Sequence, residues 1–348
     1  MRKVKLAFLF ACKSLGLFRI MGWVTRHRLR ILCYHGFSLS DDVAFRPKLF
    51  MSMERFERRL QSLRRYRMQV IPLDEAIERL YARCLPVRST VITVDDGFHS
   101  FYELAVPCLK RHGFPATVYV TTYYVRKAAP IFRLVVQYMF WKTTRRSVAL
   151  VAEPWTDDQS VDLTNTDETA KMIWKCIQYG EQQCTEEQRS EICAELGRLL
   201  GVSYDQIVES RSLHLMTPEE LRSLAAADIS VGLHTHRHRF PADDRVSAER
   251  EIAENRLELD RCTGRTASHF CYPSGLWAEL QWEWLQDLHI KSSTTCVAGL
   301  NSAKTPRHAL RRLLDGDDVH ELEFEAALCG LSDLLRAATS VRFLRRPA

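Results

Sequence analysis

The chain has 348 residues, of which 46% are hydrophobic and 26% charged, a composition typical of a globular protein with one elaborated domain or two smaller ones. This composition excludes a collagen-like, coiled-coil or largely disordered chain. The first 40 residues hold eight Lys and Arg side chains and no acid, which leaves 41 basic and 43 acidic residues in the remainder. The body of the protein is therefore not a basic nucleic-acid binder.

Residues 1–25 form the most unusual stretch, and we expect a basic amphipathic helix there. Lys13 and Arg19 interrupt its apolar runs, so it matches neither the core of a secretory signal nor a membrane span. Three interpretations stay open: a helix in the face of an anionic membrane, a helix packed on its own domain, or a cleaved or organellar presequence. The eleven cysteines are an odd number and include no C-x-x-C pair, which favours reduced thiols and a cytoplasmic protein. If the N-terminal helix lies in a membrane face, we expect the protein to be peripheral at the inner membrane face.

From residue 30 onward, strand and helix patterns alternate. The expected elements are strands at 30–37, 69–73, 89–94, 116–125, 229–234, 269–272 and 291–296, and helices at 53–65, 74–82, 99–112, 218–226 and 248–263. Such alternation predicts an α/β fold built on a parallel sheet or barrel. We expect one domain over residues 26–348, interrupted by a mainly helical insertion at about 126–215.

Two polar clusters follow predicted strands, where parallel α/β folds gather their functional groups. Asp95 and Asp96 come directly after the strand at 89–94, and adjacent carboxylates there either cap a helix, stay solvated or hold a metal. His234 and His238 follow the strand at 229–234 with His236 between them. Imidazoles four residues apart lie on one side of a helical turn and suit zinc, although surface histidines would also explain this spacing.

A third cluster is a turn after the strand at 269–272, formed by Tyr272, Pro273, Ser274 and Gly275. An ordinary turn explains these residues when they are taken alone. In an active site, such a turn can direct a backbone N–H at a developing oxyanion.

Together these clusters resemble the polysaccharide deacetylases, or NodB-homology carbohydrate esterases. The family's Thr-Phe-Asp-Asp-Gly motif is matched by residues 93–97 with Val94 in place of Phe, and its His-Thr-x-x-His motif by residues 234–238. The first strand with Tyr34 and His35 and the segment 113–121 are also similar to the family. The resemblance covers about 30–145 and 214–314 and implies a distorted (β/α) barrel of seven or eight parallel strands.

Carried over residue by residue, the resemblance implies that Asp96, His234 and His238 hold one divalent metal ion, with zinc as the first choice, and that Asp95 is the general base. The oxyanion would lie between the metal and the backbone N–H of Ser274. The implied reaction removes an N-acetyl group from an amino-sugar glycan, or from a lipid-linked or nucleotide-linked precursor.

Three departures from the family pattern bear on this mechanism. Many members have an Arg at the position of Cys271 and a Tyr at the position of Ser274, so the group that orients the base is missing or comes from elsewhere. The expected acid, a His on a late strand, is matched only by His308, which precedes that strand. His236 or a metal-bound water are alternative acids.

The other functions to be weighed are a deformylase of a lipid-linked amino sugar, a decayed glycan-binding relative and an amidohydrolase barrel. The amidohydrolase barrel would use His234 and His236 as an H-x-H pair, but that pair normally opens the first strand and here comes late. Intact Asp95, Asp96, His234 and His238 argue against decay.

Overall fold

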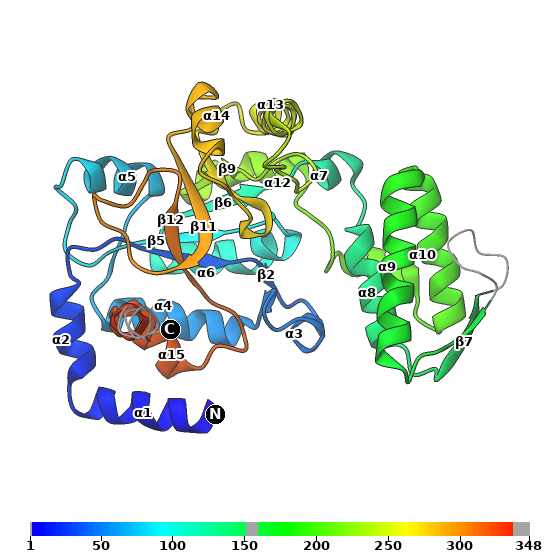
Figure 1. The fold of residues 1–348 in the computed structure, drawn as a ribbon, viewed down its shortest axis with the longest axis horizontal. Coiled ribbons are helices and arrows are strands. Elements are labelled where there is room, and N and C mark those ends of the chain that lie inside the picture. Colours follow the sequence, from blue (N-terminus) through cyan, green and yellow to red (C-terminus); the bar gives the residue numbers. More distant parts are fainter. Residues whose placement is uncertain (1, 151–158, 337–348) are drawn as a thin grey trace, which may run out of the picture.

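Seven parallel strands close into a barrel at the centre of the computed structural model, which describes residues 2–150 and 159–336 (Figure 1). Around the barrel their order is β1, β12, β11, β10, β9, β6 and β5, and the barrel closes where β5 pairs with β1. Their bounds are β1 (Arg30–Tyr34), β5 (Ser89–Val94), β6 (Ala116–Val120), β9 (Ile229–Leu233), β10 (His269–Cys271), β11 (Ser292–Ala298) and β12 (Leu310–Leu314). A short eighth strand, β4 (Gln69–Val70), pairs with β5. The prediction of a distorted parallel barrel is confirmed.

The strands are covered by helices on the outside of the barrel, so most of their residues are buried. All six residues of β5 are buried, as expected for a parallel strand covered on both faces. The surrounding helices are α4 (Met53–Arg65), α5 (Leu73–Tyr81), α6 (Val106–His112), α12 (Pro218–Ser223), α13 (Arg245–Thr263), α14 (Gln281–Asp287) and α15 (Glu321–Leu328). A π-helical turn (Phe101–Ala105) leads into α6, and a 3-10 turn (Leu224–Ala227) follows α12.

The first strand is shorter than the predicted 30–37, because the chain leaves the barrel at His35. Beyond it, β2 (Gly36–Phe37) pairs with β3 (Phe50–Met51), which precedes α4. Gly36 lies so close to the ring of Phe50 that an added Cβ would stand 2.4 Å from a ring carbon. This close approach requires glycine, and it places His35 at the rim of the barrel instead of within a strand.

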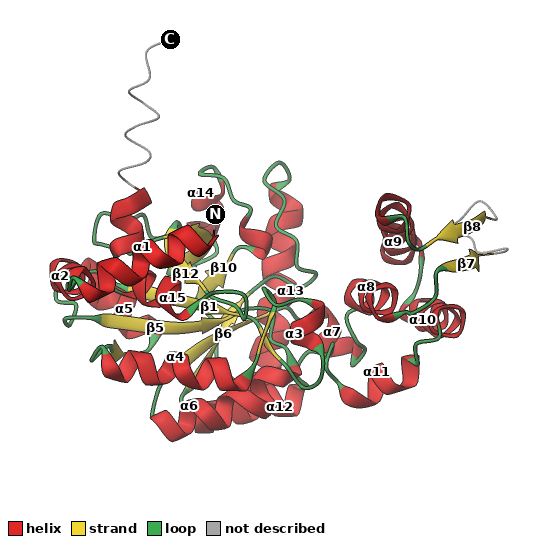
Figure 2. Ribbon diagram, turned by 90° about the horizontal axis from the view of Figure 1, so that it is seen from below, coloured by secondary structure: helices red, strands yellow, loops and turns green. Residues whose placement is uncertain are grey.

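Between β6 and β9 the chain forms a separate group of helices beside the barrel (Figure 2). These are α7 (Tyr123–Lys127), α8 (Phe132–Lys142), α9 (Thr166–Gln183), α10 (Glu186–Leu200) and α11 (Tyr204–Ser210), with the antiparallel strands β7 (Ser147–Leu150) and β8 (Gln159–Asp162). The predicted strand at 116–125 is therefore too long: β6 ends at Val120, and α7 starts at Tyr123. Beyond the end of β6, the Tyr123 backbone N–H donates to the carbonyl of His236, in the loop after β9, and not to a neighbouring strand.

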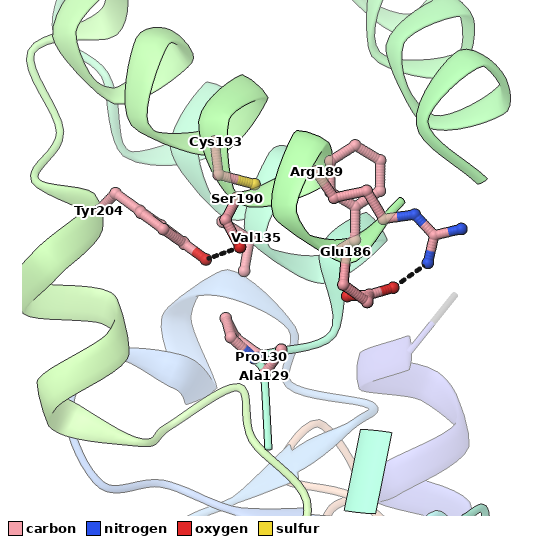
Figure 3. A pocket seen from close by; sticks show the side chains of 9 residues that line it. Ala129, Pro130, Val135, Glu186, Arg189, Ser190, Cys193 and Tyr204 are labelled. Carbon is pink, nitrogen blue, oxygen red and sulfur yellow. Dashed lines mark hydrogen bonds and ion pairs between the residues drawn. The ribbon is translucent and has the colours of Figure 1, made fainter. Parts of the chain in front are cut away.

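A small cavity lies inside this group of helices, between α10 and the loop that precedes α8 (Figure 3). Tyr204 and Ser190 are hydrogen bonded there through their hydroxyls, and Arg189 pairs with Glu186. The cavity measures about 10 Å³, which is room for no more than one water molecule. It is therefore not a substrate site.

The basic N-terminal segment forms two helices, α1 (Arg2–Ser14) and α2 (Leu17–Val24), where a single helix was predicted. Gly16 separates them with a φ of 78°, in the left-handed region that glycine adopts without strain. The two helices pack on α15 through a small apolar cluster that includes Leu9 and Phe18. In the described part of the chain, no helix is long and apolar enough to cross a membrane.

Candidate metal and catalytic centre

The predicted site residues meet at the carboxyl ends of the barrel strands. Asp95 and Asp96 directly follow β5, and His234 directly follows β9. Asp96 has a φ of 69° and Gly97 one of 86°, so the backbone turns sharply after the strand. A non-glycine residue in this region is strained, and such strain is typical of functional sites.

Asp96, His234 and His238 form a compact set of metal-ligand atoms. The Nε2 atoms of His234 and His238 lie 3.3 and 3.5 Å from Oδ1 of Asp96, and the ligand atoms of all three residues lie within 4.8 Å of one another. Nδ1 of His234 lies 2.7 Å from the carbonyl oxygen of Cys271. A carbonyl only accepts, so Nδ1 carries the proton and Nε2 presents its lone pair to the site.

The two histidines come together through an irregular loop, not through the predicted helical turn. Thr235 and His238 both have left-handed φ values, 66° and 57°, and the Thr235 hydroxyl accepts a hydrogen bond from the backbone N–H of Arg239. His236 points elsewhere, with Nδ1 2.9 Å from the hydroxyl of Thr122. The H-x-H pair of an amidohydrolase is therefore not formed in this structure.

Asp95 is held by a buried arginine from β12, which is separated from β5 only by β1. The NH1 and NH2 atoms of Arg312 lie 2.7 and 2.8 Å from Oδ1 and Oδ2 of Asp95, and the exposed fractions of the two residues are 0% and 2%. Burial raises the pKa of a carboxyl group, but the charge and hydrogen bonds of Arg312 outweigh burial and hold the pKa of Asp95 well below its ordinary value.

The sequence analysis missed Arg312, although a signal for it was present. In β12 the burial alternates so that Arg311 is exposed and Arg312 is buried. A charged residue at an inward position of a barrel strand needs a partner. Here the partner is Asp95, and the guanidinium is further fixed by donation from Nε to the carbonyl of Thr295 at 2.8 Å.

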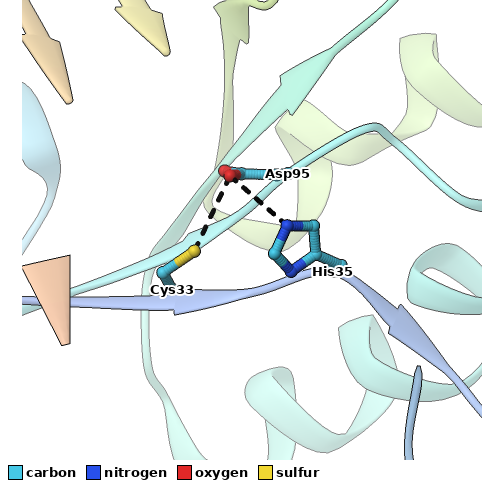
Figure 4. Close-up of side chains that lie close together, drawn as sticks. All are labelled: Cys33, His35 and Asp95. Carbon is cyan, nitrogen blue, oxygen red and sulfur yellow. Dashed lines mark hydrogen bonds and ion pairs between the residues drawn. The ribbon is translucent and has the colours of Figure 1, made fainter. Parts of the chain in front are cut away.

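His35 is the second residue that the sequence analysis did not place in the site. Its Nε2 lies 3.8 Å from Oδ2 of Asp95, and Sγ of Cys33 lies 3.6 Å from the same oxygen (Figure 4). The His35 side chain is 26% exposed, while its Nδ1 is buried without a hydrogen-bond partner among the described residues. The sequence signal was the Gly36 that follows it, which ends the strand at the barrel rim.

Comparison with known proteins identifies the family. The sequence profile of the family described as polysaccharide deacetylase matches residues 82–150 and 196–293, the two parts that flank the centre of the helical insertion. The chain belongs to the polysaccharide deacetylase family. It is accordingly a hydrolase of the deacetylase class. No protein with a curated description matches its sequence.

Solved structures of deacetylases share the fold at low sequence identity. The Streptococcus pyogenes deacetylase PplD in complex with acetate is 15% identical, with a TM-score of 0.58 over 86% of this chain and 98% of that chain. IcaB from Ammonifex degensii is 18% identical, with a TM-score of 0.54 over 87% and 97%. A de-N-acetylase from Aggregatibacter actinomycetemcomitans is 12% identical, with a TM-score of 0.55 over 86% and 99%.

One departure of this deacetylase from its family pattern, the cysteine at position 271, is explained by Arg312. Sγ of Cys271, at the position where many members have an Arg, lies 3.5 Å from Oδ2 of Asp95. The guanidinium that holds the carboxylate comes from β12 instead of β10. In the adjoining turn Tyr272 and Pro273 are buried and Gly275 packs against Cys296, whereas Ser274 is exposed with a φ of 56°.

His308, the candidate acid, lies away from the other predicted site residues. It precedes β12, and its Nδ1 is 3.0 Å from the hydroxyl of Ser293 near the start of β11. Its backbone carbonyl accepts a hydrogen bond from Tyr272. His308 lies in a turn two positions before β12, and its side-chain hydrogen bond goes to Ser293 and not to Asp95, Asp96, His234 or His238. This placement does not support His308 as the general acid.

The burial of His308 predicts a pH dependence of stability. Burial, together with the charge of Arg307, lowers the pKa of His308 to about 4, below the value of about 6.5 in an unfolded chain. The stability that this neutral imidazole contributes is therefore complete above pH of about 6.5 and is lost as the pH falls toward about 4. In urea titrations, the unfolding free energy of wild type should fall as the pH drops from about 6.5 to about 4. In His308→Gln we expect this fall to be smaller by up to about 3 kcal/mol. Equal losses would contradict the burial of a neutral His308.

Proposed function

We propose that this protein is a metal-dependent N-deacetylase of a glycan that contains N-acetylated amino sugars. The observation that carries the proposal is the difference between two adjacent carboxylates. Asp96 faces His234 and His238, whereas Asp95 is held ionised by Arg312. Paired carboxylates in unlike environments divide the roles of ligand and base between them.

The donor set fits one divalent cation. One carboxylate oxygen and two imidazole nitrogens are the ligands that catalytic zinc prefers, with a further position left for water or substrate. Burial opposes ionisation of Asp96, but the neighbouring side chains of His234 and His238 hold its pKa below the ordinary value, so the carboxylate is charged at neutral pH. A bound zinc ion would polarise the acetamide carbonyl and lower the pKa of water.

Asp95 is the proposed general base. Its two oxygens offer about four lone-pair positions, and Arg312 occupies one on each oxygen. The remaining positions accept the proton of the attacking water as its oxygen bonds to the carbonyl carbon. Arg312 acts as a positioning residue, because a bidentate pair fixes the carboxylate in orientation as well as in charge.

We propose His35, in place of His308, as the group that protonates the leaving amine. It stands beside Asp95 at the barrel rim, and its side chain is partly open to solvent. When the carbon–nitrogen bond breaks, the nitrogen takes a proton from the imidazolium of His35, and the products are acetate and a free amine. The proton that Asp95 accepted from water lies next to His35 and can pass to its ring, which replaces the proton given to the amine.

A groove between the barrel and the insertion supports a glycan substrate. It measures about 450 Å³ and is lined by Phe45 and Arg46 beside α3 (Asp42–Phe45), Trp141 of α8 and Trp174 of α9, among others. Trp141 and Trp174 are 41% and 51% exposed. Flat aromatic faces beside polar donors suit the apolar faces and hydroxyls of sugar rings.

The proposed function is tested by acetate release from N-acetylglucosamine oligomers with the zinc-loaded full chain. We expect Asp95→Asn to lower turnover at least about 100-fold, because the base is removed, while about one zinc per chain stays bound. Asp205→Asn, an exposed carboxylate on α11, is the matched control and keeps wild-type turnover. Wild-type turnover in Asp95→Asn would exclude Asp95 as the base.

The role of His35 is tested by the nature of the leaving group. An amine needs a proton to leave, whereas para-nitrophenolate does not. We therefore expect His35→Gln to lose at least about tenfold in amide hydrolysis but to hydrolyse para-nitrophenyl acetate at nearly the wild-type rate. His308→Gln is the matched control and retains both activities. If His308→Gln were instead the variant that loses amide hydrolysis, the assignment would be reversed.

A further inference from the structure

Exposed apolar side chains concentrate on the two N-terminal helices. Twenty large hydrophobic residues are exposed in the described part of the chain, and eight of them lie within 21 consecutive positions: Val4, Phe8, Phe10, Leu15, Leu17, Ile20, Trp23 and Val24. Single exposed hydrophobic residues are normal on any protein, but a contiguous group indicates an interaction surface. We call these eight residues the N-terminal apolar face.

Helix α1 is oriented with Lys5 and Lys13 toward the body of the protein and most of its large apolar residues toward solvent. Lys5 pairs with Glu323 of α15 at 2.6 Å, and Lys13 pairs with Glu325, which is buried. Val4, Phe8 and Phe10 stay 50–74% exposed. An amphipathic helix that only packed on its own domain would bury its apolar side. The ion pairs with α15 hold α1 in the opposite orientation.

Helix α2 continues the same surface at the corner of the molecule (Figure 1). Phe18 is buried against α15, whereas Ile20 and Trp23 are 55% and 61% exposed. The guanidinium of Arg26 lies 4.2 Å from the Trp23 ring centre. An exposed tryptophan beside an arginine is the pair of side chains that favours the boundary between lipid tails and headgroups.

The charge around this face indicates which partner it fits. Residues 2–30 contain no acid, and Lys3 and Arg19, at the margins of the face, have no carboxylate partner among the described residues. A second copy docked on the same face would bring these cations against their own symmetry mates, which is unfavourable. An anionic surface would be attracted to them.

We propose that α1 and α2 dock the protein on an anionic lipid bilayer. The aromatic side chains of the N-terminal apolar face enter the boundary of the acyl chains, while Lys3 and Arg19 reach the phosphate groups. The body of the protein needs no rearrangement, since α15 already holds α1 with its apolar side outward. This inference does not rest on the proposed deacetylation.

The experiment is sedimentation of the full chain with vesicles of phosphatidylcholine alone and of phosphatidylcholine with phosphatidylglycerol. We expect wild type to bind the anionic vesicles and to be released by high salt. The double variant Phe8→Ser, Phe10→Ser and the single variant Trp23→Ser should each lose at least about tenfold in partitioning. Leu257→Ser changes an exposed apolar residue of α13, outside the face, and should bind like wild type, and all variants should keep the wild-type unfolding temperature.

Several outcomes would overturn the inference. They are absence of binding to anionic vesicles, equal binding to neutral vesicles, and unchanged binding in the Phe8 and Phe10 variant. A dimer in solution that this variant dissociates would show that a second copy covers the face. Deacetylation of soluble oligomers is measured in parallel, so failure of vesicle binding remains distinguishable from failure of the proposed function.

Discussion

The ion pair between Arg312 and Asp95 is the interaction on which the site depends. Both groups lie in the closed interior of the barrel, where an unpaired charge costs several kcal/mol, so neither residue can be removed alone without penalty. The pair links β12 to the end of β5, past the intervening strand β1. Because the guanidinium bonds both carboxylate oxygens, it fixes the orientation of the carboxylate.

The backbone turn after β5 points the carboxylates of Asp95 and Asp96 in different directions and so gives them different roles. Asp95 remains in line with the strand and points into the barrel, whereas Asp96, at a φ of 69°, turns toward the loop after β9. The carbonyl of Cys271 then orients His234 toward Asp96. A buried ion pair and a candidate metal-ligand set are thus built side by side from consecutive residues.

Local patterns in the sequence were sufficient for the barrel and for the proximity of Asp96, His234 and His238, because Asp96 and His234 directly follow strands whose ends meet at one edge. They were not sufficient for residues that act across the barrel. Arg312 and Asp95 are separated by 217 positions, and only the closure of β1 between β5 and β12 brings them together. His35 depends on the close packing of Gly36 on Phe50, and the outward orientation of α1 depends on Glu323 and Glu325 of α15. Such pairings are tertiary and leave no periodic signal.

The most direct test of this account is the turnover and zinc content of Arg312→Lys. A lysine keeps a positive charge beside Asp95, so the buried carboxylate is not left unpaired. It cannot, however, form the two parallel hydrogen bonds to both oxygens of Asp95. The account predicts that the zinc-loaded variant stays folded, retains about one zinc per chain and loses at least about tenfold in turnover. Adding Asp95→Asn should then lower turnover by a smaller factor than it does in the wild type. Wild-type turnover in Arg312→Lys would contradict the assignment of Asp95 as a base that acts only when it is held from β12.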